Sequence, residues 1–238
     1  MIQANRRLKI SAAAVLAASG LAAMHTANAT DNNIGLWAVF STTDTFSSDT
    51  GDSRWSYTFD AQLRLQDIGS GATQLLARPG IGYRPGKNLQ LWAGYARIES
   101  ENTSGSRSFE NRYWQQLNWK AGNVLDGALT MRARLEEKNP STGDDVGLVL
   151  RFRAQYSRPI GTQGDKNLIV SLEPFYNLND TDWGGQSRLA QNRTLVGVGW
   201  TLSNKLTLTT AYMNQFVWRD SAEDTSNHIA VATFNVRF

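Results

Sequence analysis

The stretch WSYTFDAQLRL, residues 55–65, decides the fold class of this chain. Its apolar side chains, from Trp55 through Phe59 to Leu63, recur at every second position, and the residues between them, such as Asp60 and Arg64, are polar or charged. Successive side chains of a β-strand point to opposite faces, whereas a helix would scatter both sets around its circumference. The stretch therefore predicts a strand with one apolar face and one polar face.

The same period-two pattern recurs along the chain, most clearly at residues 129–136 and 148–156. Clusters of Gly, Asp, Asn and Ser separate the segments, as is typical of turns between strands. No apolar run after residue 29 is long enough to span a bilayer as a helix, so a membrane-crossing form would have to be built from strands. The pattern predicts about eleven strands, near residues 34–43, 54–65, 73–84, 88–99, 109–120, 127–137, 146–157, 167–178, 190–201, 205–218 and 227–238.

The connections between these segments mostly alternate in length, as in bacterial barrels with short periplasmic turns and longer external loops. Short links lie at 84–87, 121–126 and 203–205, and long polar links at 99–108, 138–145, 179–190 and 220–227. The link at 158–166 is longer than expected. The predicted fold is therefore all-β, a transmembrane antiparallel up-and-down β-barrel.

The strand number is the weak point of this prediction. Barrels of this class have even strand numbers, and the link at 43–54 is too long and polar for the short turn due there. We therefore expect ten strands, with the first segment outside the wall, or twelve, with one strand not recognised.

The two ends of the chain predict an exported protein. Arg6, Arg7 and Lys9 precede a short apolar stretch, and the triplet 27–29 offers a cleavage site, so residues 1–29 are expected to be a cleaved signal peptide. Residues 30–238 then form one barrel domain. Its last alternating segment ends on Phe238, which resembles the signal read by the bacterial barrel-assembly machinery. We expect a bacterial outer-membrane location, with membrane lipid, lipopolysaccharide and the export and assembly machinery as partners.

Charge and cysteine content narrow the function classes. The signal segment carries three of the 24 basic residues and none of the 21 acidic ones, so the remaining chain is neutral and a nucleic-acid partner has no support. The chain has no cysteine, which excludes disulfides and thiol chemistry. After residue 29, one histidine and loop carboxylates without the spacing of a calcium loop give no metal site, and no cofactor is expected.

From about Leu75 onward the sequence resembles a family of bacterial outer-membrane proteins with no assigned activity, catalogued as domain of unknown function 2490. The resemblance rests on short phrases that follow one another in order, and it implies a location but no reaction. The phrases are Arg78-Pro79-Gly80-Ile81-Gly82-Tyr83, Arg132-x-Arg134, Arg151-x-Arg153, Glu173-Pro174-Phe175, Gln191-Asn192-Arg193 before a Gly-x-Gly strand, Tyr212-Met213-x-Gln215 and His228.

The polar faces of the strands carry more arginine than acid. If the apolar faces point to lipid, nine arginines and four acidic residues point inward, and unpaired guanidinium groups in a narrow lumen would concentrate anions. Arg–Glu networks that only stabilise the wall are the alternative. The residues expected along the lumen or anion path are Arg78, Arg112, Arg132, Arg134, Arg151, Arg153, Glu173 and Arg193.

His228 is the one candidate catalytic residue after residue 29. Enzymatic barrels use a histidine that activates a hydroxyl or a water at the external rim. Ser226, Asp224 and Asn227 are its neighbours in sequence, but near neighbours on a strand alternate sides, so partners would have to come from other strands. The first hypothesis is thus a non-enzymatic barrel, either a narrow anion-preferring channel or a purely structural one. The alternative is a membrane-embedded hydrolase or lipid-modifying enzyme that uses His228.

Overall fold

The computed structural model describes residues 30–47, 53–68, 71–161, 164–219 and 222–238. The signal peptide expected at 1–29 lies outside the described residues. The described chain is all-β, and within it no helix is long and apolar enough to cross a membrane. Its strands are β1 (Thr30–Thr45), β2 (Trp55–Leu65), β3 (Thr73–Tyr83), β4 (Leu89–Glu101), β5 (Arg107–Val124), β6 (Gly127–Pro140), β7 (Gly147–Ile160), β8 (Lys166–Asn177), β9 (Leu189–Thr201), β10 (Leu206–Val217) and β11 (Asp224–Val236).

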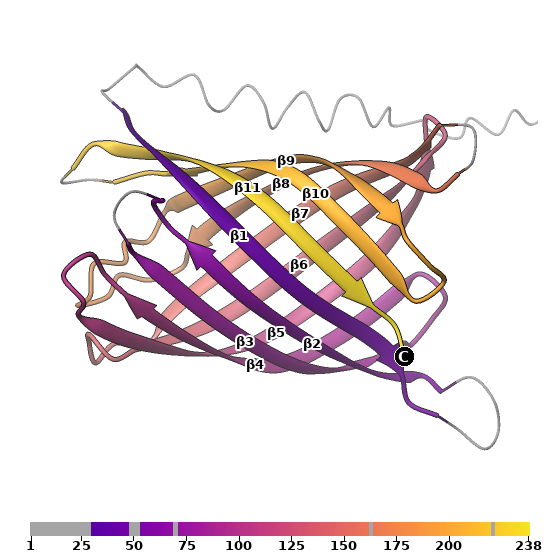
Figure 1. Ribbon diagram of the computed structural model, residues 1–238. Helices are drawn as coiled ribbons and strands as arrows, with labels where there is room; N and C mark the ends of the chain where they lie inside the picture. The colour runs from indigo at the N-terminus through magenta and orange to yellow at the C-terminus, as the bar shows by residue number, and fades with distance from the viewer. Residues whose placement is uncertain (1–29, 48–52, 69–70, 162–163, 220–221) are drawn as a thin grey trace, which may run out of the picture.

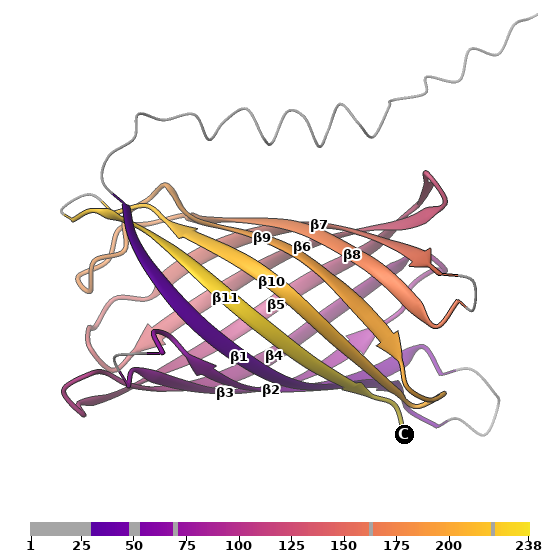
Figure 2. The ribbon, with the colours of Figure 1, turned by 45° about the horizontal axis from the view of Figure 1, so that its top comes forward.

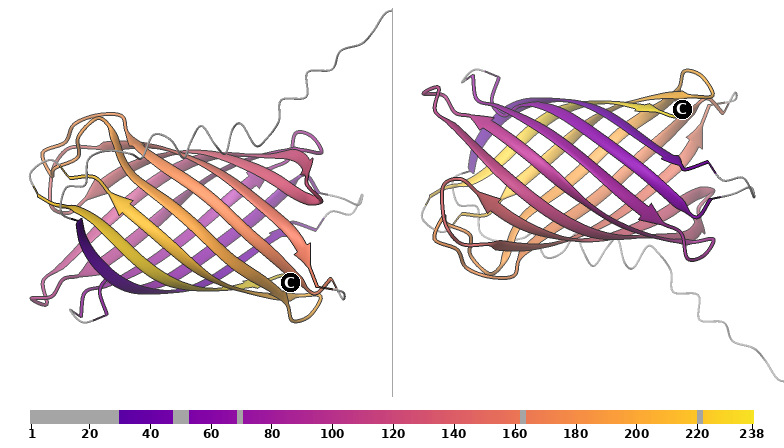
Figure 3. Two further views of the ribbon diagram at one scale, coloured as in Figure 1. Left: turned by 90° about the horizontal axis from the view of Figure 1, so that it is seen from above. Right: turned by 90° about the horizontal axis from the view of Figure 1, so that it is seen from below.

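The strands form one closed barrel in which each strand pairs with its neighbours in sequence. All of these neighbouring pairs are antiparallel, and the wall is strongly inclined to the long axis (Figures 1 and 2). Views from above and below show the same inclination on both sides (Figure 3). The up-and-down barrel predicted from the alternating pattern is confirmed.

The described residues contain eleven strands, rather than the ten or twelve expected from the even-number rule. An odd number makes the first and last strands run in the same direction, so β1 closes the barrel by parallel pairing with β11, from Thr30↔Asp224 to Thr42↔Val236. The segment at 34–43 is therefore part of the wall. The long link before Trp55 is a connection between β1 and β2, and no further strand lies among the described residues.

The parallel closure places the beginning of β1 and the C-terminus at opposite ends of the barrel (Figure 1). The C-terminal end carries the connections 46–54, 84–88, 125–126, 161–165 and 202–205. The other end, which we call the loop end, carries 66–72, 102–106, 141–146, 178–188 and 218–223. The tightest connection is at the C-terminal end, where Leu125 and Asp126 both have positive φ, as a two-residue type I′ hairpin turn requires.

Burial follows the predicted alternation. On β2, Phe59 and Leu63 are 38% and 44% exposed, whereas Arg64 on the opposite face of the same strand is only 8% exposed. Apolar side chains thus cover the outer face, and polar and charged side chains fill the interior. This inverted arrangement places the candidate site inside the barrel.

Candidate functional site: an arginine-rich cavity inside the barrel

Glu136 on β6 is the centre of the interior ion-pair network. Its carboxylate accepts hydrogen bonds from Arg151 Nη1 at 2.5 Å, Arg112 Nη1 at 3.0 Å and Arg134 Nη1 at 3.4 Å. The side chain of Glu136 is 2% exposed. A carboxylate buried to this degree requires several partners, because each charge removed from water costs several kcal/mol.

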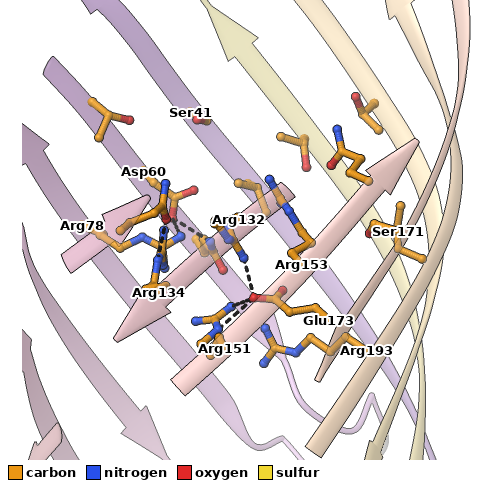
Figure 4. A pocket seen from close by; sticks show the side chains of 18 of the residues that line it. Ser41, Asp60, Arg78, Arg132, Arg134, Arg151, Arg153, Ser171, Glu173 and Arg193 are labelled. Atoms are coloured by element: carbon orange, nitrogen blue, oxygen red, sulfur yellow. Dashed lines mark hydrogen bonds and ion pairs between the residues drawn. The ribbon is translucent and has the colours of Figure 1, made fainter. Parts of the chain in front are cut away.

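Glu173 on β8 continues the network toward the next strands. It accepts a hydrogen bond from Arg151 Nε at 2.9 Å and also from Arg132 on β6 (Figure 4). Arg151 therefore joins the two buried carboxylates, Glu136 and Glu173. The planar guanidinium suits this role because it offers donors along two edges.

A row of cations and aromatic rings crosses the lumen beside the ion pairs. The guanidinium carbon of Arg64 on β2 lies 4.1 Å from the ring centroid of Trp37 on β1. Arg193 on β9 lies over Trp37 at 4.9 Å and over Phe175 at 4.7 Å, and Arg151 lies over Phe175 at 4.2 Å. Two strands separate β9 from β1 in the wall, so the contact between Arg193 and Trp37 spans the interior.

We call these interior residues the central layer. Together they connect seven strands, and most of the layer is buried, with Trp37, Phe175 and Glu136 at 6%, 7% and 1% exposure. Such contacts of guanidinium with ring faces are attractive, and more so where water is excluded. The members of the central layer are Trp37, Arg64, Arg112, Glu136, Arg151, Phe175 and Arg193.

A cavity of about 530 Å³ lies between the central layer and the C-terminal end. Its lining reaches Thr43 near the end of β1, Asn235 near the end of β11 and Thr209 near the start of β10. These strand ends all lie at the C-terminal end of the barrel (Figure 1). The interior is therefore a one-sided cavity with the central layer as its floor.

Basic residues outnumber acidic ones around this cavity. Arg64, Arg78, Arg132, Arg134, Arg151, Arg153 and Arg193 contribute to the lining, against Asp60 and Glu173. Asp60 pairs with Arg78 at 3.1 Å. Arg153 makes no hydrogen bond or ion pair with the other described residues, although it lies within electrostatic reach of Glu173. The lining of the cavity therefore carries an excess of positive charge.

The structure brings together the residues that the alternating pattern placed inside. Seven of the eight expected lumen residues line the cavity, and the eighth, Arg112, lies in the central layer. Sequence reasoning missed the interior aromatic residues Trp37, Trp92, Trp114 and Phe175. Their inward direction follows from strand parity, but the cation contacts join strands that are far apart in sequence.

Interior glycines make room for two of these aromatic rings. A Cβ on Gly82 would lie 2.6 Å from the ring of Trp92, and one on Gly80 would lie 2.6 Å from the ring of Trp114. The rings therefore pack against bare backbone. This packing explains the two glycines of the Pro-Gly-Ile-Gly phrase on β3, and that phrase is the signal in the sequence that could have pointed to the interior rings.

His228 lies outside the lumen, on the outer face of β11, because its neighbour Ile229 is buried inside. Its Nδ1 lies 2.7 Å from the hydroxyl of Tyr212 on β10, and its Nε2 lies 3.3 Å from Oδ1 of Asn32 on β1. Its partners thus come from other strands. The hydroxyl of Ser226 instead accepts a hydrogen bond from Asn214.

The described residues hold no group of three or more His, Cys, Asp or Glu side chains that could bind a metal ion. The carboxylate of Asp182 in the 178–188 connection instead binds the neighbouring loop. It accepts hydrogen bonds from the backbone N–H groups of Asp144 at 2.9 Å and Asp145 at 3.2 Å. These two hydrogen bonds lower the pKa of Asp182.

Comparison with known proteins agrees with the sequence resemblance. A family model described as a protein of unknown function (DUF2490) matches residues 34–227, from β1 into β11. An uncharacterized protein of Methylorubrum extorquens is 29% identical over 184 residues, which cover 77% of this chain and 81% of that relative. The chain therefore belongs to the DUF2490 family of proteins of unknown function.

Proposed function

We propose that this protein is an outer-membrane barrel whose lumen prefers small anions. One observation carries the proposal: the wall is apolar outside and arginine-rich inside. Leu75, Ile81 and Val196 on the outer face are 56%, 49% and 47% exposed. In water, an apolar surface that continues around the whole barrel would be unfavourable. The same wall is favourable in lipid, because a closed barrel satisfies its backbone hydrogen bonds internally.

Aromatic residues on the outer face support a membrane setting. On β5, Tyr113 and Trp119 are 53% and 48% exposed and six residues apart, which corresponds to about 20 Å along a strand. Tyr95 contacts Tyr113 with ring centroids 5.6 Å apart, and Tyr83 contacts Trp55 at 5.0 Å. Membrane barrels carry two such aromatic girdles, on either side of an apolar band roughly 25 Å tall.

The connections support an orientation. Bacterial barrels have short turns on the periplasmic side and longer loops outside. The shortest connections, 125–126 and 202–205, lie at the C-terminal end, and the longest, 178–188, lies at the loop end. We therefore orient the C-terminal end toward the periplasm, so the cavity opens inward and the central layer faces the cell surface.

The lumen supports a narrow path rather than an open pore. Small barrels of about eight strands are filled by side chains, whereas those of about 16 strands leave an aqueous channel. Here a cavity and a buried layer share one lumen. Anions would gather in the cavity and cross the central layer only when its side chains move, which implies a low conductance.

The reversal potential of the refolded barrel in a planar bilayer under a KCl gradient tests this proposal. We expect a small conductance with a reversal potential shifted from zero toward the equilibrium potential of chloride. The double variant Arg132→Gln/Arg153→Gln should move the reversal potential toward zero, because it removes two positive charges from the lining of the cavity. The variant should still fold, because Glu173 keeps Arg151 as a partner. Arg97→Gln on the outer face is the matched control and should change nothing. Cation selectivity would contradict the proposal.

A purely structural barrel is the second candidate, and the buried central layer favours it. Silence from a barrel that shows the heat-dependent gel shift of a closed wall would support this candidate. The row of Tyr212, His228 and Asn32 is the observation that bears on the enzyme alternative. If the purified protein hydrolyses phospholipid and His228→Ala abolishes the turnover, the protein is an enzyme.

A further inference from the structure

The lining of the cavity changes character along the barrel axis. Near the central layer it is charged, with Arg132, Arg153 and Glu173 close together (Figure 4). Toward the C-terminal end it consists mainly of uncharged hydroxyl and amide side chains. These mouth residues include Thr43, Gln90, Asn118, Gln155, Thr209 and Asn235. A charged floor and a neutral hydrogen-bonding mouth suit a ligand with two chemically different ends.

The hydrogen-bonding groups left unpaired around the cavity are mostly donors. Among the described residues, the buried N–H groups of Trp37, Trp92 and Trp114 and Nε of Arg132 have no hydrogen-bond partner, and all four residues contribute to the lining. Unpaired buried polar groups are rare in folded proteins, and each one calls for an explanation. Neighbouring atoms cover all four donors, so an oxygen acceptor in the cavity reaches them only when the surrounding side chains move.

The positions of two arginines identify the charged end of such a ligand. Arg132 binds Glu173 through one nitrogen only, and Arg153 makes no ion pair with another described residue. Arginine forks recognise carboxylate and phosphate groups through paired hydrogen bonds. An oxyanion beside these two side chains would not have to displace Arg151, which the central layer already holds.

We propose that the cavity is a binding site for a small sugar acid or sugar phosphate, an oxyanion group carried on a hydroxylated body. The oxyanion lies against Arg132 and Arg153, and the hydroxyl groups of the body meet the Thr, Gln and Asn side chains of the mouth. The volume of about 530 Å³ accommodates one such molecule. This inference names the ligand class of the proposed anion-preferring lumen and rests on that proposal only for the side of entry.

Isothermal titration calorimetry on the detergent-solubilised barrel, after its heat-dependent gel shift has been verified, tests the inference. The probes are glucuronate, glucose 6-phosphate, glucose and inorganic phosphate at one salt concentration. We expect glucuronate and glucose 6-phosphate to bind at least about tenfold more tightly than glucose, because only they carry the group that pairs with an arginine fork. Glucose 6-phosphate should also bind more tightly than inorganic phosphate.

Two variants separate the two ends of the site. Arg132→Gln/Arg153→Gln should weaken both charged probes about tenfold or more. Asn118→Leu/Thr209→Val should weaken glucose 6-phosphate and leave inorganic phosphate unchanged. Arg97→Gln, on the outer face, is the control for general loss of positive charge.

Three outcomes would overturn the inference: a folded barrel that binds none of the probes, equal affinity for glucose and glucuronate, or equal affinity for phosphate and glucose 6-phosphate. An equal loss in Arg97→Gln would overturn it as well. These outcomes are distinguishable from failure of the proposed function. The reversal potential reports anion preference without any sugar. If the barrel is anion-selective but binds no sugar anion, the inferred ligand class is wrong and the proposed function stands.

Discussion

Inside the barrel, Arg151 Nη1 donates a 2.5 Å hydrogen bond to Oε1 of Glu136, and the two side chains are 6% and 2% exposed. Arg112 and Arg134 point to the same carboxylate. The single negative charge of Glu136 therefore offsets a group of buried guanidinium ions. Its loss would leave Arg134 without an ion-pair partner among the described residues, whereas Arg151 would keep Glu173 and Arg112 would keep Glu110.

We expect Glu136→Gln to destabilise the barrel by roughly 3 kcal/mol, because removing one partner leaves buried charges uncompensated. Gln has nearly the same shape, so the effect isolates the charge. Urea unfolding in lipid vesicles, followed by tryptophan fluorescence, measures it. Glu99→Gln is the control, because its side chain is 63% exposed and its pair with Arg97 should contribute no more than about 1 kcal/mol. Equal stabilities of the two variants would argue against the role of the network.

Gly94 provides a test of the packing against the wall. A Cβ at this position would overlap the carbonyl oxygen of Pro79 and the ring of Trp114. Since the backbone oxygen cannot rotate away, Gly94→Ala should cost about 1–3 kcal/mol. Gly86→Ala should stay within about 0.5 kcal/mol, because no atom lies within 4 Å of the added Cβ. If the Gly94→Ala barrel were as stable as the Gly86→Ala barrel, the backbone of the wall and the ring of Trp114 would have to shift to make room for the added Cβ.

The sequence predicts the wall well, and the reason is local. Alternation at period two depends only on neighbouring residues, so each of the eleven predicted segments overlaps a strand and the interior arginines are placed on the correct face. The pairing of first and last strands is not local. It depends on the barrel closing, and the even-number rule gave the wrong count because β1 and β11 pair in parallel.

The central layer could be predicted only in part. Parity places Trp37 and Arg193 inside, but the register between strands decides whether they meet, and β9 and β1 are not neighbours. The one-sided cavity depends on how the side chains of many strands divide the lumen. For His228, parity excludes only Asn227 as a partner. Ser226 shares its face, but the hydroxyl of Ser226 accepts a hydrogen bond from Asn214. The actual partners Tyr212 and Asn32 lie on β10 and β1.

The parallel closure can be tested by a disulfide. Ser41 on β1 and Asn235 on β11 are register partners, and the chain contains no cysteine. Neighbouring strands lie about 4.8 Å apart. This spacing falls within the range of a disulfide. Ser41→Cys/Asn235→Cys should therefore crosslink on oxidation, as read by reducing and non-reducing gels, and the pair Ser41→Cys/Leu202→Cys should not. Absence of the crosslink in a folded barrel would contradict the eleven-strand closure.

The orientation predicts which loops face the cell exterior. Ser104 lies in the 102–106 connection at the loop end, and Ser203 lies in the 202–205 connection at the C-terminal end; both are exposed. A membrane-impermeant maleimide should label Ser104→Cys on intact cells, and Ser203→Cys only after the outer membrane is permeabilised. The reverse labelling pattern would show that the barrel has the opposite orientation, with the cavity open to the cell exterior.

The contact between the 141–146 and 178–188 connections at the loop end should depend on pH. The pKa of Asp182 is lowered because the backbone N–H groups of Asp144 and Asp145 donate to its ionised carboxylate. A group with a lowered pKa in the folded state stabilises that state above its unfolded pKa, about 3.9 for Asp, and the contribution is lost as the pH falls through the folded pKa.

We therefore expect the 141–146 and 178–188 loops to stay protected from hydrogen exchange at neutral and mildly acidic pH, and to open only below the ordinary range of an aspartate. Asp182→Asn keeps the size of the side chain but removes the charge that the two N–H groups bind, so these loops should exchange faster at neutral pH, with the barrel strands unaffected. Asp165→Asn, at the C-terminal end, is the control and should leave both loops unchanged. If Asp182→Asn exchanges at the wild-type rate, the loops are held by the indole of Trp183, whose N–H donates to the backbone oxygen of Asp145 at 2.9 Å, and the carboxylate is dispensable.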